Sequence, residues 1–301
     1  MSTTAMSPST QRPSYYPGAY ALQHMQSLEC RWDNGVEWTP NVEGLSSLQV
    51  IVYPEAQAGW DRYEEIYGQF DPLNCFTLPN ADSGYCSWDS ITENGAWVEV
   101  VYDGMDAADA IGGPGSAFMT MVDSILATVS SAQVGQRWYP QARQPLPECG
   151  ELLTDEVIGT ALGIDPASVS INSDPIGGTS LQYEAQQASG SYPCFWIVPQ
   201  LETAYGNTVD SLPGGEWAWN DARKHDTAKA SASPLALTNL NSLDSAWISS
   251  SSKYGFTYTT IDLIVGGNWI SFSLENGDIA SLGKGEAVMT QLAQGIVDTL
   301  K

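Results

Sequence analysis

The sequence predicts an α+β fold built as two tandem repeats of a small antiparallel sheet packed with helices. Three observations support this prediction. Segments with the two-residue periodicity of strands are interspersed with segments of helical periodicity in both halves of the chain. Tryptophans recur in the same order in the two halves, and four of the five cysteines can be paired within single halves. Helices mixed with antiparallel hairpins are typical of a sheet covered by helices.

The repeat is visible as matching residues at nearly constant shifts, with differences that insertions in loops would produce. It predicts a first repeat over residues 15–132, a linker over 133–147 and a second repeat over 148–301. The first repeat is expected to lack its N-terminal helix. The matched pairs are Trp60/Trp219 and Trp88/Trp247 at a shift of 159, Cys30/Cys194 and Trp32/Trp196 at 164, and Trp97/Trp269 at 172.

In the first repeat, each element follows from local pattern and punctuation. A run of β-branched and aromatic residues ended by Pro54 predicts a strand, and three- and four-residue spacing of Tyr63, Ile66 and Tyr67 predicts one face of a helix. An Asn-Gly pair predicts the turn of a hairpin. The expected elements are a strand over 48–53, a helix over 60–67, strands over 85–89 and 96–102, and a helix over 117–129.

The second repeat begins with a predicted short helix over 152–162, for which Thr154 is a suitable N-cap and Gly163 a suitable C-terminal residue. Strand character predicts two strands that follow it. A longer hairpin turns at Gly266 and Gly267. The expected strands cover 180–185, 192–198, 256–261 and 269–274.

The cysteines predict two disulfides, Cys75–Cys86 and Cys149–Cys194. At a shift of 159, Cys75 and Cys86 fall on Pro234 and Ser245, so both thiols are absent from the other repeat, as a disulfide requires. Disulfides indicate an oxidising, extracytoplasmic compartment. Cys30 is left over: its partner is expected upstream of Met1 together with an export signal, which residues 1–17 lack, or the partner has been lost and a free thiol remains.

A family resemblance rests on Cys149, Leu152-Leu153, Leu162-Gly163 and the Cys194-x-Trp196 motif. This pattern resembles small actinobacterial cell-envelope lipoproteins and secreted proteins of unknown function. The resemblance implies an extracellular or cell-envelope location and a sheet that is PsbP-like in outline. It implies no activity.

Charge and missing motifs exclude several classes of function. The chain has 35 acidic and 11 basic residues, and its net charge of −24 repels nucleic acids and anionic membranes. No apolar segment is long enough to span a bilayer. The two histidines, His24 and His225, accompany no nucleophile elbow, and no phosphate loop with its lysine is present. Asp103, Asp106 and Asp109 lack the spacing of a calcium loop. We therefore assign no catalytic residue, cofactor or metal ligand.

The candidate binding residues are Trp217, which has no partner in the repeat, and the basic run Arg223, Lys224 and His225. The sequence favours an exported, non-enzymatic binding or interaction protein of the envelope or medium. Its ligand would be a protein, a glycan or a small molecule, with the cleft between the repeats as the expected site. The alternative is a secreted hydrolase that uses carboxylates, which two buried acids converging in one cleft would favour.

Overall fold

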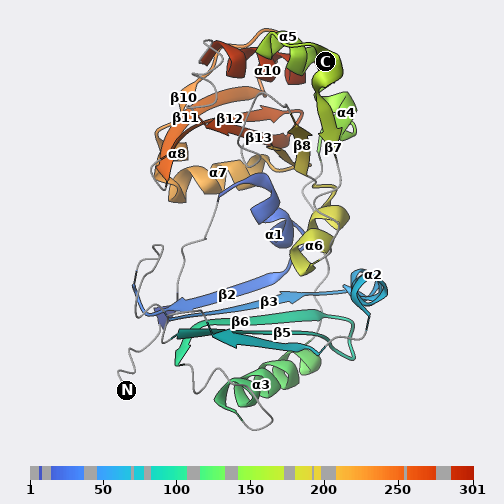
Figure 1. The fold of residues 1–301 in the computed structure, drawn as a ribbon, viewed down its shortest axis with the longest axis vertical. Helices are drawn as coiled ribbons and strands as arrows, with labels where there is room; N and C mark the ends of the chain where they lie inside the picture. Colours follow the sequence, from blue (N-terminus) through green and yellow to red (C-terminus); the bar gives the residue numbers. More distant parts are fainter. Residues whose placement is uncertain are drawn as a thin grey trace. The chain divides into compact units, whose positions relative to one another are not determined.

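The structure, a computed structural model, is α+β with two antiparallel sheets (Figure 1). The chain divides into two compact units. The first contains Met1–Arg12, Leu22–Trp138 and Thr179–Ala185; the second contains Pro13–Ala21, Tyr139–Gly178 and Gln186–Lys301. The described residues are 7–8, 15–36, 46–68, 71–77, 83–106, 116–132, 142–172, 180–191, 193–197, 208–253, 256–275 and 286–301.

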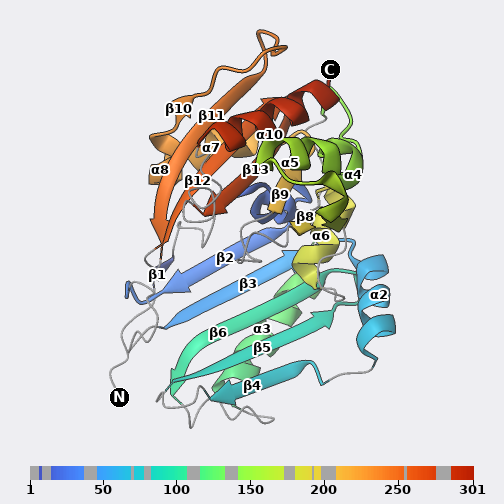
Figure 2. The same cartoon turned by 45° about the horizontal axis from the view of Figure 1, so that its top comes forward.

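The first unit is a six-stranded sheet in the order β1-β2-β3-β6-β5-β4, with the strands from β2 to β4 side by side in Figure 2. Helix α3 (Ala117–Ser131) covers one face, and helix α2 (Gln57–Tyr67) follows β3. The strands are β1 (Ser7–Pro8), β2 (Leu28–Asp33), β3 (Ser47–Tyr53), β4 (Leu73–Thr77), β5 (Ser83–Ile91) and β6 (Trp97–Asp106).

The second unit is a seven-stranded sheet in the order β10-β11-β12-β13-β9-β8-β7. Its strands are β7 (Ser170–Asn172), β8 (Pro193–Ile197), β9 (Thr208–Leu212), β10 (Ser233–Pro234), β11 (Ser245–Lys253), β12 (Phe256–Val265) and β13 (Asn268–Glu275). Its helices are η1 (Pro17–Tyr20), α4 (Cys149–Leu152), α5 (Asp155–Leu162), η2 (Pro166–Ser168), α7 (Glu216–His225), α8 (Thr227–Ala230) and α10 (Glu286–Thr299).

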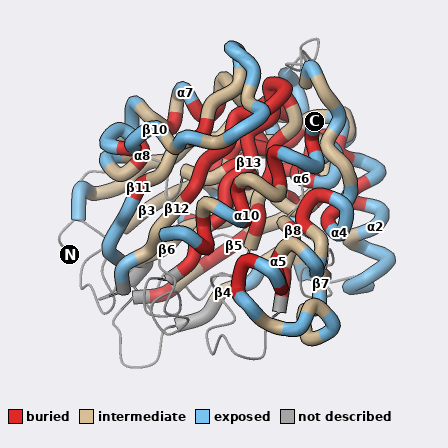
Figure 3. The backbone as a smooth tube through the Cα atoms, turned by 90° about the horizontal axis from the view of Figure 1, so that it is seen from above, coloured by how far each residue is buried: buried red, intermediate tan, exposed pale blue. Residues whose placement is uncertain are grey.

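Each sheet buries one face under the helix that follows its last strand. In the first unit, α3 buries Phe118 and Val122 against the sheet. In the second unit, α10 and α5 pack over a larger core, and most of β13 and the second half of β12, Ile261–Val265, are buried (Figure 3). Gly295 of α10 allows α5 to approach closely, since a Cβ at Gly295 would lie 2.4 Å from Cγ1 of Val157.

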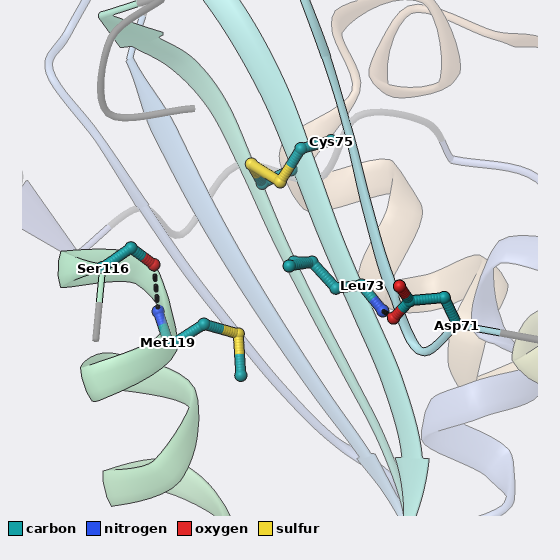
Figure 4. Close-up of a disulfide and its surroundings, with 6 residues drawn as sticks. Asp71, Leu73, Cys75, Ser116 and Met119 are labelled. Carbon is teal, nitrogen blue, oxygen red and sulfur yellow. Dashed lines mark hydrogen bonds between the residues drawn. A yellow bond between two sulfur atoms is a disulfide. The ribbon is translucent and has the colours of Figure 1, made fainter. Parts of the chain in front are cut away.

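The local signals in the sequence explain where several elements begin and end. The hydroxyl of Thr154 accepts the amide of Val157 at 3.3 Å, and Gly163 ends α5 with a left-handed φ of 71°. Ser116 caps α3 in the same way, accepting the amide of Met119 at 3.2 Å (Figure 4). Gly266 adopts a positive φ at the β12–β13 turn. The predicted hairpins and the helices of these regions are confirmed.

The two sheets have the same strand order. Strands β1-β2-β3-β6-β5-β4 of the first sheet correspond one by one to β7-β8-β9-β13-β12-β11 of the second. Cys30 of β2 lies opposite Val50 of β3, and Cys194 of β8 lies opposite Val209 of β9, so the two cysteines hold equivalent places. The strand order corrects one expectation. Trp88 on β5 neighbours β6, whereas Trp247 on β11 lies two strands away from β13, so these two tryptophans are not equivalent.

A second correction concerns residues 180–185, which were expected to form a strand. They belong to helix α6 (Leu181–Ser189), because the hydroxyl of Ser180 accepts the amide of Tyr183 at 3.1 Å and caps a helix. Leu181 and Ala185 are then buried at a spacing of one helical turn. A shift of 164 places α6 on residues 17–25, which hold η1 and α1 (Ala21–His24).

These two equivalent segments are exchanged between the units. Tyr20 belongs to the second unit, where its hydroxyl donates to Asp221 of α7 at 3.1 Å. Glu184 belongs to the first unit, where it accepts hydrogen bonds from Arg62 of α2 and lies against Gly59. The predicted boundaries at 15–132 and 148–301 did not contain this exchange. Of the predicted linker, residues 133–141 lie outside the described part of the chain.

Both predicted disulfides are present. Cys75–Cys86 joins directly opposed residues of β4 and β5 (Figure 4), and Cys149–Cys194 joins α4 to β8. At the corrected register, the place of the first disulfide in the second unit is taken by Ser250 opposite Thr259. Cys30 forms no disulfide with any described residue and is half-buried.

Candidate functional site

Both units contain the same arrangement of two tryptophans and an aspartate on the sheet face opposite the long helix. In the first unit, Trp60 of α2 packs edge-on against Trp97 of β6, with ring centroids 5.1 Å apart. The indole NH of Trp97 donates to the carboxylate of Asp89 on β5 at 3.1 Å. The tryptophan ring is fully buried, so this bond satisfies its only polar atom.

In the second unit, Trp219 of α7 packs against Trp269 of β13 at 5.7 Å, and the indole NH of Trp269 donates to Asp262 at 2.8 Å. A lysine distinguishes this copy. The ammonium of Lys229 donates to both carboxylate oxygens of Asp262, at 3.0 and 2.9 Å. Lys229 is 5% exposed and Asp262 is 1% exposed, so this ion pair is sealed from solvent.

The first unit carries a row of carboxyls without such a lysine. Asp89, Glu99 and Glu29 lie on the strands β5, β6 and β2 of one sheet face, and Asp89 is directly opposite Glu99. Burial, with the negative charges of Asp89 and Glu29, raises the pKa of Glu99 to about 7. Burial also raises the pKa of Asp89, against the hydrogen bond from Trp97.

The equivalent row of the second unit crosses β12, β13 and β9 at Asp262, Ser271 and Asp210. Burial raises the pKa of Asp210 to about 7, although the charge of Lys229 acts in the opposite direction. Asp262 already occupies Lys229 with both oxygens, so the charge of Asp210 has no counter-ion of its own among the described residues. The row therefore ends in one compensated and one uncompensated carboxyl.

A hollow of about 350 Å³ opens over this uncompensated carboxyl. It lies on the sheet face opposite α10, beyond the end of the face that α7 covers. All of its described lining residues belong to the second unit, and none of them is a lysine, an arginine or a histidine. The lining residues are Tyr16, Gln186, Pro193, Phe195, Thr208, Asp210, Tyr258, Ser271, Phe272 and Ser273.

Several polar side chains of the hollow have no protein partner within the described ranges. They include the carboxyl of Asp210, the hydroxyl of Ser271 and the amide of Gln186. Ser271 is 4% exposed and Gln186 is 9% exposed. Polar groups so deeply placed are normally hydrogen-bonded to protein or to ordered water. Their free donors and acceptors therefore face a space in which a ligand or water would satisfy them.

The sequence-predicted binding residues all lie on α7 and are not brought into this hollow. Trp217 is half-buried: it packs against the core of the second unit and lies edge-on to Tyr20, with ring centroids 5.7 Å apart. The guanidinium of Arg223 lies over the ring of Trp247 at 4.2 Å. Lys224 is exposed, and His225 lies 3.7 Å from Asp221.

The sequence analysis missed Asp210, Ser271 and Gln186. A weak signal was present: an aspartate within the apolar strand β9, at the position where the first repeat has Ile51 at a shift of 159. A charged residue on the inner strand of a sheet indicates a special environment. The other polar residues of the hollow could not be identified from the sequence, since Gln186 and Ser271 come from α6 and β13.

The described residues give no support for a metal site or for a membrane-spanning helix. Among them, no three His, Cys, Asp or Glu side chains gather as metal ligands, and Asp109 lies outside the described ranges. His24 is buried, and burial lowers its pKa. Within the described part of the chain, no helix has the length and apolar character needed to cross a membrane.

Comparison with known protein families, with curated proteins and with solved structures gives no match to this chain.

Proposed function

We propose that this chain is an exported binding protein whose second unit holds a small polar ligand in the hollow over Asp210. The observation that carries the proposal is the set of unpartnered polar groups beneath aromatic walls. Small-molecule sites generally combine apolar and aromatic walls with a few placed polar groups. The volume of about 350 Å³ lies at the small end of the usual range for such sites. The two disulfides support an oxidising compartment.

The burial and the hydrogen bonds of Asp262, the other carboxylate of the row, favour a binding function over hydrolysis. A carboxylate-dependent hydrolase needs two acids that both reach the substrate or its attacking water. Asp262 is 1% exposed, and its oxygens are occupied by Lys229 and Trp269, so it reaches neither. The paired acids Asp89 and Glu99 of the first unit are not part of the lining of the hollow. Among the described lining residues, Asp210 is thus the one acid, which suits it to holding a ligand.

The test is capture of small molecules by the disulfide-intact protein. The protein is incubated with a metabolite extract, washed, denatured, and the released compounds are identified by mass spectrometry. A Ser271→Phe variant, which fills the hollow, should release none of the compounds retained by the wild type. A Thr208→Val variant keeps the volume and removes one hydroxyl, and should retain them less.

The matched control is Ser124→Phe, at an exposed position of α3 in the first unit, which should retain the same compounds as the wild type. Circular dichroism and thermal unfolding verify that each variant is folded. Equal retention by the wild type and by folded Ser271→Phe would contradict the proposal.

A further inference from the structure

The charges of the residues that line the hollow indicate which ligands it can accept. Among the described residues that line it, Asp210 is the only ionisable acid or base apart from the two tyrosines, Tyr16 and Tyr258. An anionic ligand would meet an uncompensated carboxyl and no cation. Placing two like charges in a partly buried site is unfavourable, so carboxylate and phosphate ligands are disfavoured.

The nearest cation is already committed elsewhere. Lys229 donates to both oxygens of Asp262 and lies 5.3 Å from the ring centroids of both Trp219 and Trp269. It is 5% exposed and held on α8, whose first turn is capped by Asp226. Moving Lys229 to Asp210 would leave the buried Asp262 without its counter-ion. No described residue is therefore free to act as the counter-ion of Asp210, and a bound cation would supply one.

We infer that the ligand of the hollow is a small organic cation, an amine or ammonium compound, whose positive group pairs with the carboxylate of Asp210. The inference rests on the proposed function and names its substrate class. Tyr16, Tyr258 and Phe195 provide π-systems for the cationic group, which aromatic faces attract. Gln186 and Ser271 provide acceptor oxygens for ammonium hydrogens that Asp210 does not take. The net charge of −24 raises the local concentration of cations around the chain.

Binding of a cation to Asp210 is linked to its protonation. The group has a pKa of about 7 in this environment, so it is mostly neutral at pH 6 and mostly ionised at pH 8. Only the ionised form pairs with an ammonium group. The affinity for an amine should therefore rise by about tenfold between pH 6 and pH 8, whereas the affinity for a neutral compound should not rise.

The experiment uses pairs of probes that differ only in charge: benzylamine with benzyl alcohol, and butylamine with butanol, together with glucose. Each is titrated into the full-length protein, and binding is followed by the chemical shifts of backbone amides in β8, β9 and β13. We expect each amine to bind at least about tenfold more tightly than its alcohol at pH 8, the strength of a charge-assisted contact in a partly buried site.

Two variants assign the effect to Asp210. Asp210→Asn mimics the neutral carboxyl, so it should fold and should bind amine and alcohol equally at both pH values. Asp123→Asn removes the same charge from an exposed position of α3 and should behave as the wild type. If alcohols or glucose bind in the hollow as tightly as the amines, the inference of a cationic ligand is refuted, whereas the proposed binding site is still supported. No shift changes in β8, β9 and β13 with any probe would overturn both.

Discussion

The raised pKa of Glu99 predicts how the free energy of unfolding changes with pH. Burial beside Asp89 and Glu29 raises its pKa from 4.5 to about 7 in the folded chain. Below pH 4.5 the group is protonated in both the folded and the unfolded chain. Between pH 4.5 and 7 the unfolded chain releases the proton while the folded chain keeps it, so the free energy of unfolding falls as pH rises. Above pH 7 the loss is complete.

The size of the effect follows from the shift. Each pH unit corresponds to about 1.4 kcal/mol, so the full shift of Glu99 corresponds to about 3 kcal/mol. Glu99 is half-buried, and solvent screening reduces this to about 2 kcal/mol between pH 5 and pH 8. Glu99→Gln cannot ionise. The variant should therefore be more stable than the wild type at pH 8 by about 2 kcal/mol more than it is at pH 5.

The assay is urea denaturation of the wild type and Glu99→Gln at both pH values, with hydrogen exchange of peptides from β5 and β6 to locate the effect in the first unit. Asp210 contributes equally to both proteins, so it cancels in the difference. Glu93→Gln, an exposed residue of the β5–β6 turn, is the matched control and should follow the wild type. Parallel pH dependence in the wild type and Glu99→Gln would refute the reasoning.

Two further substitutions test the packing and the buried ion pair of the second unit. Gly295→Ala should cost about 1–3 kcal/mol in thermal denaturation, since its Cβ would meet Val157 at 2.4 Å, whereas Gly150→Ala in α4, with no atom within 4 Å, should be neutral or stabilising. Similar effects of the two glycine variants would contradict this account. Lys229→Met should cost about 3–5 kcal/mol in urea denaturation, because it leaves the carboxylate of Asp262 buried without its cation. Adding Asp262→Asn should restore most of this stability, and a double variant as unstable as the single one would show that the charge is not the cause.

Local features of the fold could be predicted from the sequence, because they depend on neighbouring residues. The capping threonine Thr154, the glycines of the β12–β13 turn and the cysteine spacings each act over a few positions or within one repeat. The match of Trp88 to Trp247 failed for a physical reason. The strand of the second unit that corresponds to β5 is β12, which lies further along the chain than a constant shift of 159 predicts. An ungapped comparison cannot detect this difference, and the residue that holds the place of Trp88 is Ile261.

The candidate site could not be predicted from the sequence, because its residues are distant in the chain and become neighbours only in the folded sheet. Asp210, Gln186 and Ser271 come from three separate elements. Trp217 attracted attention because it had no partner in the repeat, yet its ring packs against Tyr20, which is distant in the sequence. Segment 180–185 was assigned to a strand because its residues have strand propensity, whereas the cap at Ser180 and the packing of Glu184 against α2 favour a helix.

The exchange of the two segments around Tyr20 and Glu184 has a consequence for synthesis. Arg62 is separated from Glu184 by 122 positions, and Tyr20 from Asp221 by 201. A nascent chain that has released only the first repeat lacks Glu184, so the acid that pairs with Arg62 has not yet emerged. Tyr20 leaves the ribosome long before the helix that receives it. Closing such distant contacts is slow compared with local folding, so both units reach completion only late in translation.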